Sequence, residues 1–141
     1  MPSEFSITRK VEFAETDMAG IMHFSNFYRW METVEHEFFR SLGLSIHMQV
    51  NGQSIGWPRL EASCKFKSPL KFEETATIHL DIEEITDKTV TYRFDIEKDG
   101  NEGIIRIAKG RMTTVCATLE PETGKLSAIP IPRAIREKLD P

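Results

Sequence analysis

The sequence predicts one α+β domain in which a single long helix packs against an antiparallel sheet. Two observations lead to this prediction. Apolar residues recur at every second position near the N-terminus and again in segments after residue 59, which is the period of strands. Between these parts, apolar residues recur every three or four positions from Asn26 to Gly43, which is the period of an amphipathic helix. A strand, a helix and then consecutive strands joined by short turns is an α+β order.

The composition is that of one compact domain. The chain has 141 residues, 40% hydrophobic content and a formal net charge of −4, so residues 1–141 are expected to form one core. A pI near 5.6 and interspersed charges argue against a nucleic-acid partner. No apolar run approaches the roughly eighteen residues of a membrane span, and Met1 to Phe5 lack the pattern of a secretory leader. We therefore expect a cytoplasmic protein without a membrane span.

The first forty residues predict a strand, a loop and one long helix. The strand is expected from Phe5 to Phe13, where apolar and polar residues alternate. The helix is expected to end at Gly43. Its apolar stripe comprises Phe27, Trp30, Met31, Val34, Phe38 and Leu42. A stripe this aromatic predicts that a sheet wraps the helix.

The rest of the chain predicts an antiparallel meander and a short helix. The four expected strands run over Leu60 to Phe66, Ala76 to Ile85, Thr89 to Ile96 and Gly103 to Thr118. Residues typical of turns separate them. The segment from Glu120 to Pro132 holds three prolines and one glycine and is expected to be irregular. A helix from Arg133 to Leu139 is expected to start at Pro132.

The junction before the long helix carries the strongest functional signal. Asp17 and Gly20 precede a helix N-terminus, whose unpaired N–H groups and positive dipole end polarise a carbonyl oxygen. Asp17 adds a carboxylate, which completes the minimum equipment for attack on an activated acyl group. Capping and turn formation are the alternative roles for these residues.

One stretch, Glu15-Thr-Asp-Met-Ala-Gly-Ile-Met-His-Phe-Ser-Asn-Phe, resembles the signature of the 4-hydroxybenzoyl-CoA thioesterase family of hotdog-fold enzymes. The similarity continues in Tyr28-Arg-Trp-Met-Glu and in Phe66-Lys-Ser-Pro-Leu-Lys-Phe-Glu, and it spans about Phe5 to Leu119. It implies the hotdog fold, in which a curled antiparallel sheet wraps a long central helix. It also implies hydrolysis of an acyl-CoA thioester to a free acid and CoA.

The resemblance assigns roles to particular residues. Asp17 is expected to be the catalytic carboxylate, as nucleophile or general base, and the backbone N–H of Phe24 is expected to bind the thioester oxygen. The other residues expected at the substrate are Gly20, Ile21, Met22, His23, Asn26 and Phe27. His23 is expected to line the pocket, with proton transfer as the alternative. Asn26 is expected to cap the helix or hold the Asp17 loop.

Coenzyme A carries phosphates, so basic side chains are expected at the mouth of the cleft. Lys88 and Arg93 are the candidates, because they flank strand ends or solvent faces. Ordinary solvated charges are the alternative for both. No further cofactor is expected. The two cysteines, Cys64 and Cys116, are expected to be free thiols.

The helix carries a second group of polar residues. Glu32, Glu35 and His36 are expected on its polar side, where a carboxylate and a histidine can bind metal. A solvated Glu32–His36 pair is the favoured interpretation, and no metal is expected. Direct catalysis by Glu32 is a further alternative.

A single hotdog sheet leaves strand edges and the acyl channel open, so a homodimer or homotetramer with clefts shared between chains is expected. Two other functions stay open. A thioesterase acting on acyl-carrier protein would need exposed basic residues near the channel. A noncatalytic acyl-CoA-binding hotdog module would use the same pocket without turnover, and the presence of Asp17 argues against it.

Overall fold

The computed structural model describes residues 4–140, and the expectations for Met1 to Ser3 lie outside these residues. Its elements are β1 (Phe5–Lys10), the 3₁₀ helix η1 (Phe13–Glu15), α1 (Ser25–Ser41), β2 (Met48–Val50), β3 (Gln53–Gly56), β4 (Arg59–Phe66), β5 (Thr75–Ile85), β6 (Thr89–Gly100), β7 (Gly103–Val115), β8 (Ala117–Leu119), β9 (Leu126–Ala128) and α2 (Arg133–Leu139).

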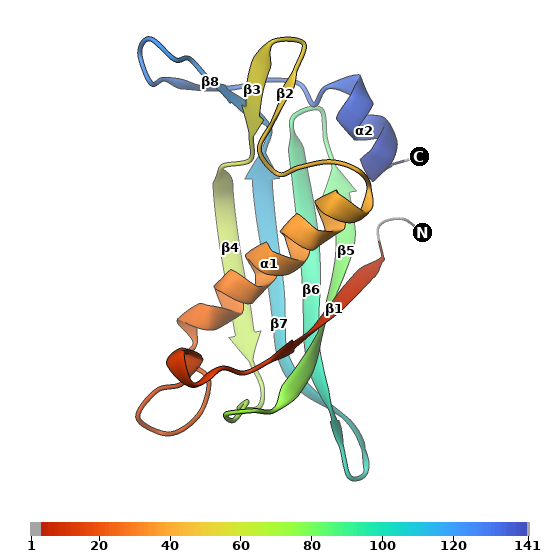
Figure 1. Cartoon of the computed structure of the whole chain (residues 1–141). Helices are drawn as coiled ribbons and strands as arrows, with labels where there is room; N and C mark the ends of the chain where they lie inside the picture. Colours follow the sequence, from red (N-terminus) through yellow and green to blue (C-terminus); the bar gives the residue numbers. More distant parts are fainter. Residues whose placement is uncertain (1–3, 141) are drawn as a thin grey trace.

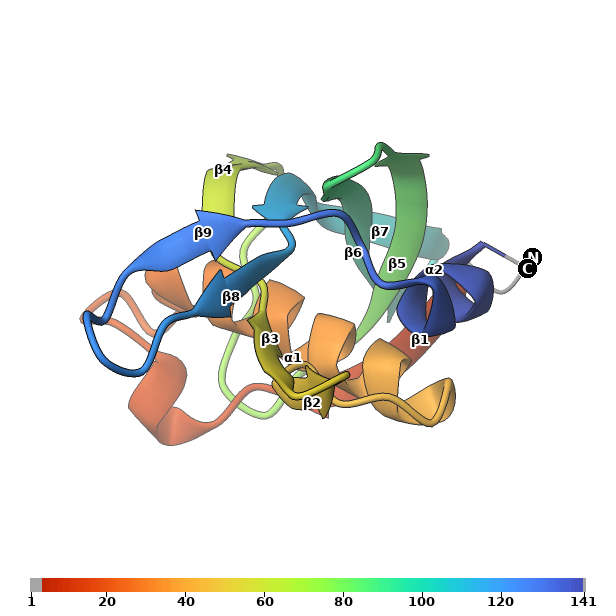
Figure 2. The same ribbon diagram turned by 90° about the horizontal axis from the view of Figure 1, so that it is seen from above.

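The main sheet has five strands in the order β1-β5-β6-β7-β4, and every neighbouring pair is antiparallel. The helix α1 crosses one face of this sheet, and the strands curl around it (Figures 1 and 2). The strands and the helix predicted from periodicity therefore form the expected α+β arrangement. Strand β4 lies at one edge of the sheet and β1 at the other.

The core lies between α1 and the main sheet. The apolar stripe of the helix is buried along most of its length, at Phe27, Trp30, Met31, Val34, Phe38 and Phe39. On strands β5 and β6, side chains alternate between buried and outward positions, and the buried ones contribute to the same core. At Gly110 of β7 a Cβ atom would overlap the Sδ atom of Met31, so the absent side chain lets the helix approach the sheet.

A second, smaller sheet was not predicted. It has the order β2-β3-β8-β9 and lies at one end of the main sheet. The strand expected from Gly103 to Thr118 breaks at Cys116, whose N–H donates to Lys88 O and whose carbonyl accepts from Ile129. The chain thereby leaves the main sheet and continues as β8. Strands of three residues carry too little periodicity to be read from a sequence.

The first predicted strand is shorter in the structure, whereas the last predicted helix has the expected bounds. The strand expected to reach Phe13 ends at Lys10, because residues Phe13–Glu15 form the 3₁₀ helix η1, which has a capping box between Glu12 and Glu15. Phe13 is consequently exposed and packs edge-on against Phe72. The C-terminal helix has the predicted bounds. No helix within residues 4–140 combines the length and apolarity that a bilayer crossing requires.

Candidate active site

The loop before α1 is closed by its own backbone. Asp17 N–H donates to Ile21 O at 2.8 Å, and Gly20 N–H donates to Asp17 O at 3.0 Å. Gly20 has φ +80°, in the left-handed region that a side chain disfavours. Met22 N–H donates to Leu70 O at 2.7 Å, which fixes the loop against the turn after β4.

One of the two oxygens of the Asp17 carboxylate is hydrogen-bonded within this loop. Its Oδ1 atom accepts hydrogen bonds from Ala19 N at 2.9 Å and from Ile21 N at 3.4 Å. Its Oδ2 atom accepts no hydrogen bond from residues 4–140. One oxygen is therefore positioned by the loop while the other is available to a ligand.

Glu15 joins the loop to the helix, a role that the sequence analysis missed. Its carboxylate accepts hydrogen bonds from Trp30 Nε1 and from Glu12 N, each at 2.8 Å. Its carbonyl accepts from His23 N and from Asn26 Nδ2, also at 2.8 Å. Asn26 thus holds the loop, which is one of the two roles proposed for it. The family motif begins at Glu15, but no local pattern predicts the hydrogen bond to a tryptophan fifteen positions away.

The first turn of α1 leaves one amide unused. Ser25 N–H donates to His23 Nδ1 at 3.3 Å, and Asn26 N–H donates to His23 O at 3.0 Å. Phe27 N–H donates to Phe24 O at 3.2 Å. Within the described chain, the N–H of Phe24 has no acceptor. This amide lies at the positive end of the helix dipole, where it can bind a carbonyl oxygen.

Asp17 and Phe24 both line one cavity of about 410 Å³. Its wall is largely aromatic, since Phe66 lies 5.4 Å from Phe27 and 6.2 Å from Phe24 between ring centroids. Its complete lining is Asp17, Ile21, Met22, Phe24, Phe27, Phe66, Lys67, Ser68 and Pro69. The last four belong to the end of β4 and the following turn. This segment belongs to the stretch that resembles the family, but no role in the site was predicted for it from the sequence.

Some predicted site residues lie outside this lining. Gly20 and Asn26 donate hydrogen bonds to carbonyl oxygens of the loop, those of Asp17 and Glu15. The exposed ring of His23 stacks on Phe24, with 4.7 Å between ring centroids. Lys88 lies in the β5–β6 turn, at the opposite end of the sheet from the Asp17 loop (Figure 1). Arg93 is exposed on β6, 3.8 Å from Glu83. A single chain therefore does not bring Lys88 or Arg93 to the cavity.

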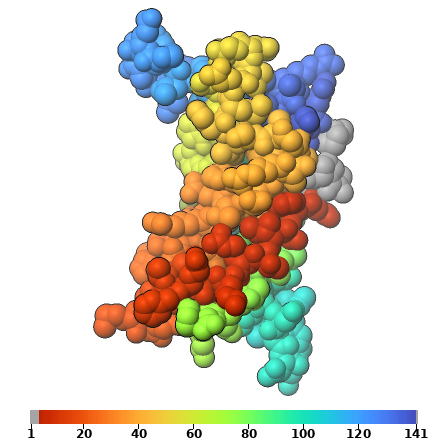
Figure 3. Space-filling view, viewed as in Figure 1, coloured from red at the N-terminus to blue at the C-terminus, as the bar shows by residue number. Residues whose placement is uncertain are grey.

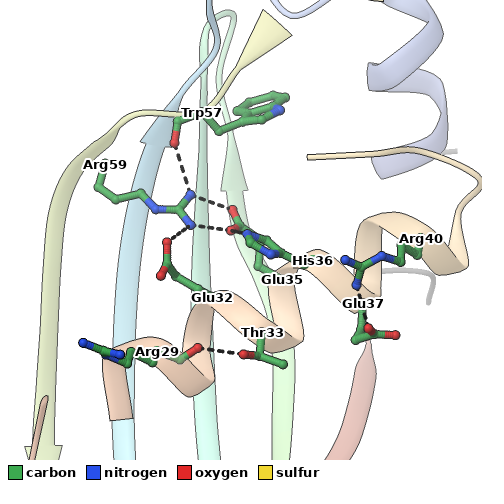
Figure 4. Close-up of polar contacts among 9 residues, drawn as sticks. All are labelled: Arg29, Glu32, Thr33, Glu35, His36, Glu37, Arg40, Trp57 and Arg59. Atoms are coloured by element: carbon green, nitrogen blue, oxygen red, sulfur yellow. Dashed lines mark hydrogen bonds and ion pairs between the residues drawn. The ribbon is translucent and has the colours of Figure 1, made fainter. Parts of the chain in front are cut away.

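The polar residues of α1 form a different arrangement from the expected solvated face. Glu35 is fully buried, which corrects its placement on the polar side of the helix. Arg59 binds it through two nitrogens, at 2.6 and 3.0 Å, and also binds Glu32 at 3.1 Å (Figure 4). The partner of Glu32 is therefore Arg59, and His36 lies 3.9 Å from Glu35. The arginine comes from the start of β4, a contact that helical spacing cannot reveal.

This buried cluster has unusual electrostatics. Desolvation raises the pKa of Glu35 to about 7, although Arg59 opposes the shift. The hydroxyl of Tyr92 and the Nε1 atom of Trp57 are buried without a partner among residues 4–140. Glu35 lies eleven positions after Phe24, roughly 16 Å along the helix axis. The cluster is thus separate from the Asp17 cavity, and the described residues form no group of three metal-ligating side chains.

Comparison with known proteins assigns the chain to a family. Residues 11–139 match the model of the thioesterase-like superfamily. The chain belongs to this superfamily. It is 32% identical over 126 residues to a protein of Aquifex aeolicus (strain VF5) that is named as an esterase, covering 89% of this chain and 91% of that one. It is 23% identical over 134 residues to 4-hydroxybenzoyl-CoA thioesterase of Pseudomonas sp. (strain CBS-3), covering 94% of both.

Solved structures of the superfamily share the fold. A gentisyl-coenzyme A thioesterase has a TM-score of 0.80 at 31% identity, with 96% of this chain and 99% of that one covered. The predicted family resemblance, the hotdog fold and the enzyme class of thioester hydrolase are confirmed. The roles of individual residues remain predictions at this point.

Proposed function

We propose that this thioesterase-superfamily chain hydrolyses an acyl-CoA thioester to a free acid and CoA in the Asp17 cavity. The observation that carries the proposal is the pairing of a carboxylate oxygen and an unpartnered helix-start amide in one cavity. The thioester carbonyl accepts a hydrogen bond from Phe24 N–H, which stabilises the negative charge that develops on its oxygen. Asp17 then acts either as the nucleophile or as the general base that activates a water molecule.

Two routes are consistent with this geometry. In the first, an oxygen of Asp17 attacks the carbonyl carbon, CoA leaves as a thiolate, and water hydrolyses the mixed anhydride. In the second, Asp17 takes a proton from a water molecule that attacks the carbonyl directly. A thiolate is a good leaving group, so neither route needs an acid at the sulfur. The left-handed φ of Gly20 lets the loop turn back so that Gly20 N–H reaches the carbonyl oxygen of Asp17.

The acyl group that the cavity fits best is aromatic. Phe24, Phe27 and Phe66 form a wall whose rings meet edge-on or tilted. Such walls favour flat, apolar groups of similar size. The relatives support this choice, because their names specify gentisyl-, 4-hydroxybenzoyl- and 1,4-dihydroxy-2-naphthoyl-CoA.

Among the described residues that line the cavity, one is a cation that could bind the CoA arm. Lys67 belongs to the lining, whereas Lys88 and Arg93 lie elsewhere on the sheet. We propose Lys67 as the first contact for a CoA phosphate. The phosphate contacts predicted for Lys88 and Arg93 would require a second chain, because neither residue lines the cavity of its own chain.

The working unit that we propose is a homodimer or homotetramer. Strand β4 ends the main sheet without a neighbour beyond it in the described chain. The cavity lies at the end of this strand, because Phe66, the last residue of β4, belongs to its lining. Light scattering at micromolar concentration is expected to give a mass of two or four chains.

The test is a thiol-release assay against a panel of acyl-CoA thioesters. Aromatic acyl-CoA is expected to turn over faster than acetyl-CoA, and Asp17→Asn is expected to remove the activity. Turnover of an acyl-carrier-protein thioester in preference to every acyl-CoA would favour the alternative substrate. Tight acyl-CoA binding without release of CoA thiol would favour the noncatalytic binding module instead.

A further inference from the structure

The face of the main sheet opposite α1 carries no helix in the described chain. The space-filling view shows residues of α1 and β1 covering the sheet on the helix side (Figure 3). Figure 2 shows α1 below the sheet and neither helix above it. On this outer face, the long side chains of Lys65, Arg93, Lys109 and Arg111 are exposed. They are therefore accessible to a ligand.

Part of this outer face has charged neighbours of opposite sign. Asp81 of β5 stands opposite Arg93 of β6, and Asp95 of β6 stands opposite Lys109 of β7. Opposite charges directly across two strands stabilise a sheet. These pairs are the arrangement that sheet stability favours.

Two adjacent pairs have the contrary arrangement. Arg93 also stands opposite Arg111 of β7, and Lys109 also stands opposite Lys65 of β4. Lys109 and Arg111 are two positions apart on one strand, so the two like-charged pairs lie next to each other on the same face. Like charges directly opposite each other are destabilising. An anion bound between the two pairs would offset this repulsion.

The four cations line one cavity of about 320 Å³. This volume is at the small end of the roughly 300 to 1,000 Å³ range of ligand sites. Glu83 also belongs to the lining and holds the two arginines. Its Oε2 atom accepts from Arg111 Nη2 at 2.8 Å and from Arg111 Nε at 2.9 Å, and its Oε1 atom lies 3.8 Å from Arg93 Nε. One carboxylate thus positions both guanidinium groups and leaves three positive charges unbalanced.

The two lysines supply the charge that no carboxylate neutralises. The ammonium groups of Lys65 and Lys109 form no ion pair with residues 4–140, since Asp95 pairs with Arg106 instead, at 3.4 Å. The exposed hydroxyl of Ser63 adds a further donor to the lining. The cavity therefore combines ammonium, guanidinium and hydroxyl donors.

This set of donors fits a compact ligand with several phosphate oxygens. Guanidinium groups bind phosphate through two parallel N–H bonds, and lysines bind it as point charges. The two pairs of cations are separated by roughly 6 to 7 Å along β7, which favours linked phosphates over a single one. Glu61 and Asp81 border the cations, and the chain has a formal net charge of −4. An extended polyanion or an anionic membrane would meet these repulsive charges.

We propose that the outer face of the main sheet carries a binding site for a small molecule with a diphosphate group, formed by Lys65, Arg93, Lys109 and Arg111. The site is separate from the Asp17 cavity, because Lys65 and Phe66 point to opposite faces of β4 and each lines a different cavity. Inorganic pyrophosphate and a nucleoside diphosphate both carry the required group.

Calorimetric titration of the full chain at low ionic strength tests the site. Inorganic pyrophosphate is expected to bind one site per chain, at least tenfold more tightly than inorganic phosphate. Lys65→Gln and Lys109→Gln are each expected to raise the Kd for pyrophosphate about tenfold. The matched control is Lys10→Gln, which removes an exposed cation of β1 at the far edge of the sheet and is expected to leave this Kd unchanged.

ADP as a second titrant distinguishes the two sources of the diphosphate. Tighter binding of ADP than of pyrophosphate would indicate a nucleoside diphosphate, and weaker binding would indicate the inorganic ion. Unchanged affinity for pyrophosphate in the Lys65→Gln/Lys109→Gln variant would overturn the site. Binding of phosphatidylserine vesicles through the same lysines, without binding of pyrophosphate, would also overturn it in favour of a membrane surface.

Urea unfolding tests the repulsion independently of affinity. Without an anion, Lys109→Gln is expected to unfold at the same or a higher urea concentration than wild type, because one like-charged pair is removed. Pyrophosphate is expected to raise the midpoint of wild type much more than that of the variant. A lower midpoint of the anion-free variant would contradict the repulsion on which the site rests.

Two further measurements separate this site from the acyl-CoA cavity. Lys67→Gln is expected to keep the affinity for pyrophosphate, and loss of binding in this variant alone would place the anion in the Asp17 cavity and overturn the inference. Lys65→Gln/Lys109→Gln is expected to keep KM for acyl-CoA within about twofold, and a tenfold rise would overturn the separation. If wild type hydrolyses no acyl-CoA, the proposed function fails, whereas the titrations still decide the diphosphate site.

Discussion

Arg59 holds the buried carboxylate of Glu35 through two nitrogens, at 2.6 and 3.0 Å, and so fastens the start of β4 to the third turn of α1. The same guanidinium donates to Trp57 O at 3.1 Å. The pair attaches one end of β4 to the helix, and the other end of this strand supplies Phe66 to the wall of the Asp17 cavity. The buried pair is therefore a structural device, distant from the proposed chemistry.

Removal of the arginine alone is expected to be costly. Arg59→Met leaves a buried carboxylate without its partner, and we expect a loss of about 3 to 5 kcal/mol in the free energy of unfolding at pH 8. The double variant Glu35→Leu/Arg59→Met removes both charges and is expected to recover most of this loss. Urea unfolding of the three proteins measures both effects. Equal losses in the single and double variants would contradict the assigned pairing.

The raised pKa of Glu35 predicts a pH-dependent stability. Burial raises this pKa to about 7, so the folded state binds the proton more tightly than the unfolded state does. The corresponding stability is fully present below about pH 4.5, the ordinary pKa, and is lost as the pH rises through about 7. Glu35→Gln mimics the protonated form, so it is expected to gain stability relative to wild type over this range. If the free energies of unfolding of wild type and Glu35→Gln change in parallel between pH 4.5 and 8, the raised pKa of Glu35 is refuted.

Asp17→Asn keeps the size of the side chain but removes its nucleophilicity and basicity. We expect kcat to fall by roughly 10²- to 10⁴-fold while the acyl-CoA still binds. Single turnover of the wild-type enzyme in ¹⁸O-labelled water separates the two routes by mass spectrometry. Label in the Asp17 side chain indicates an anhydride, and label in the product alone indicates that water attacks the acyl carbon. Near-normal turnover by the folded variant would remove Asp17 from the mechanism.

The backbone amide of Phe24 can be tested apart from its ring. Phe24→Leu is expected to change KM and acyl preference more than kcat, because it keeps the N–H. Phe24→Pro removes the donor and is expected to lower kcat about 100-fold or more. Circular dichroism checks that the proline variant is folded. Full activity in a folded proline variant would exclude this amide as the oxyanion donor.

Glu15 is expected to couple the loop to the helix energetically. Glu15→Ala and Trp30→Phe each remove the hydrogen bond between the carboxylate and Nε1. In a double-mutant cycle we expect a coupling of about 1 kcal/mol in stability and a fall in kcat of about tenfold for Glu15→Ala. If the two substitutions have additive effects on stability and Glu15→Ala leaves kcat unchanged, the hydrogen bond does not position the loop.

Periodicity by itself determined the elements that bury one continuous face. The helix stripe from Phe27 to Phe38 and the alternating residues of β5, β6 and β7 are local patterns, and local patterns fix helix or strand without knowledge of the partner. The short motif around Asp17 also placed the loop correctly before the helix. The second sheet was missed because each of its strands is only three or four residues long.

The tertiary structure alone decided which distant residues share a site. Glu15 meets Trp30, Glu35 meets Arg59, and Phe66 closes the cavity of Asp17, and each contact joins segments whose separation carries no local signal. Burial of Glu35 shows the physical reason most clearly. Its helical position is ordinary, and only an arginine brought in by β4 makes a carboxylate tolerable at a fully buried position.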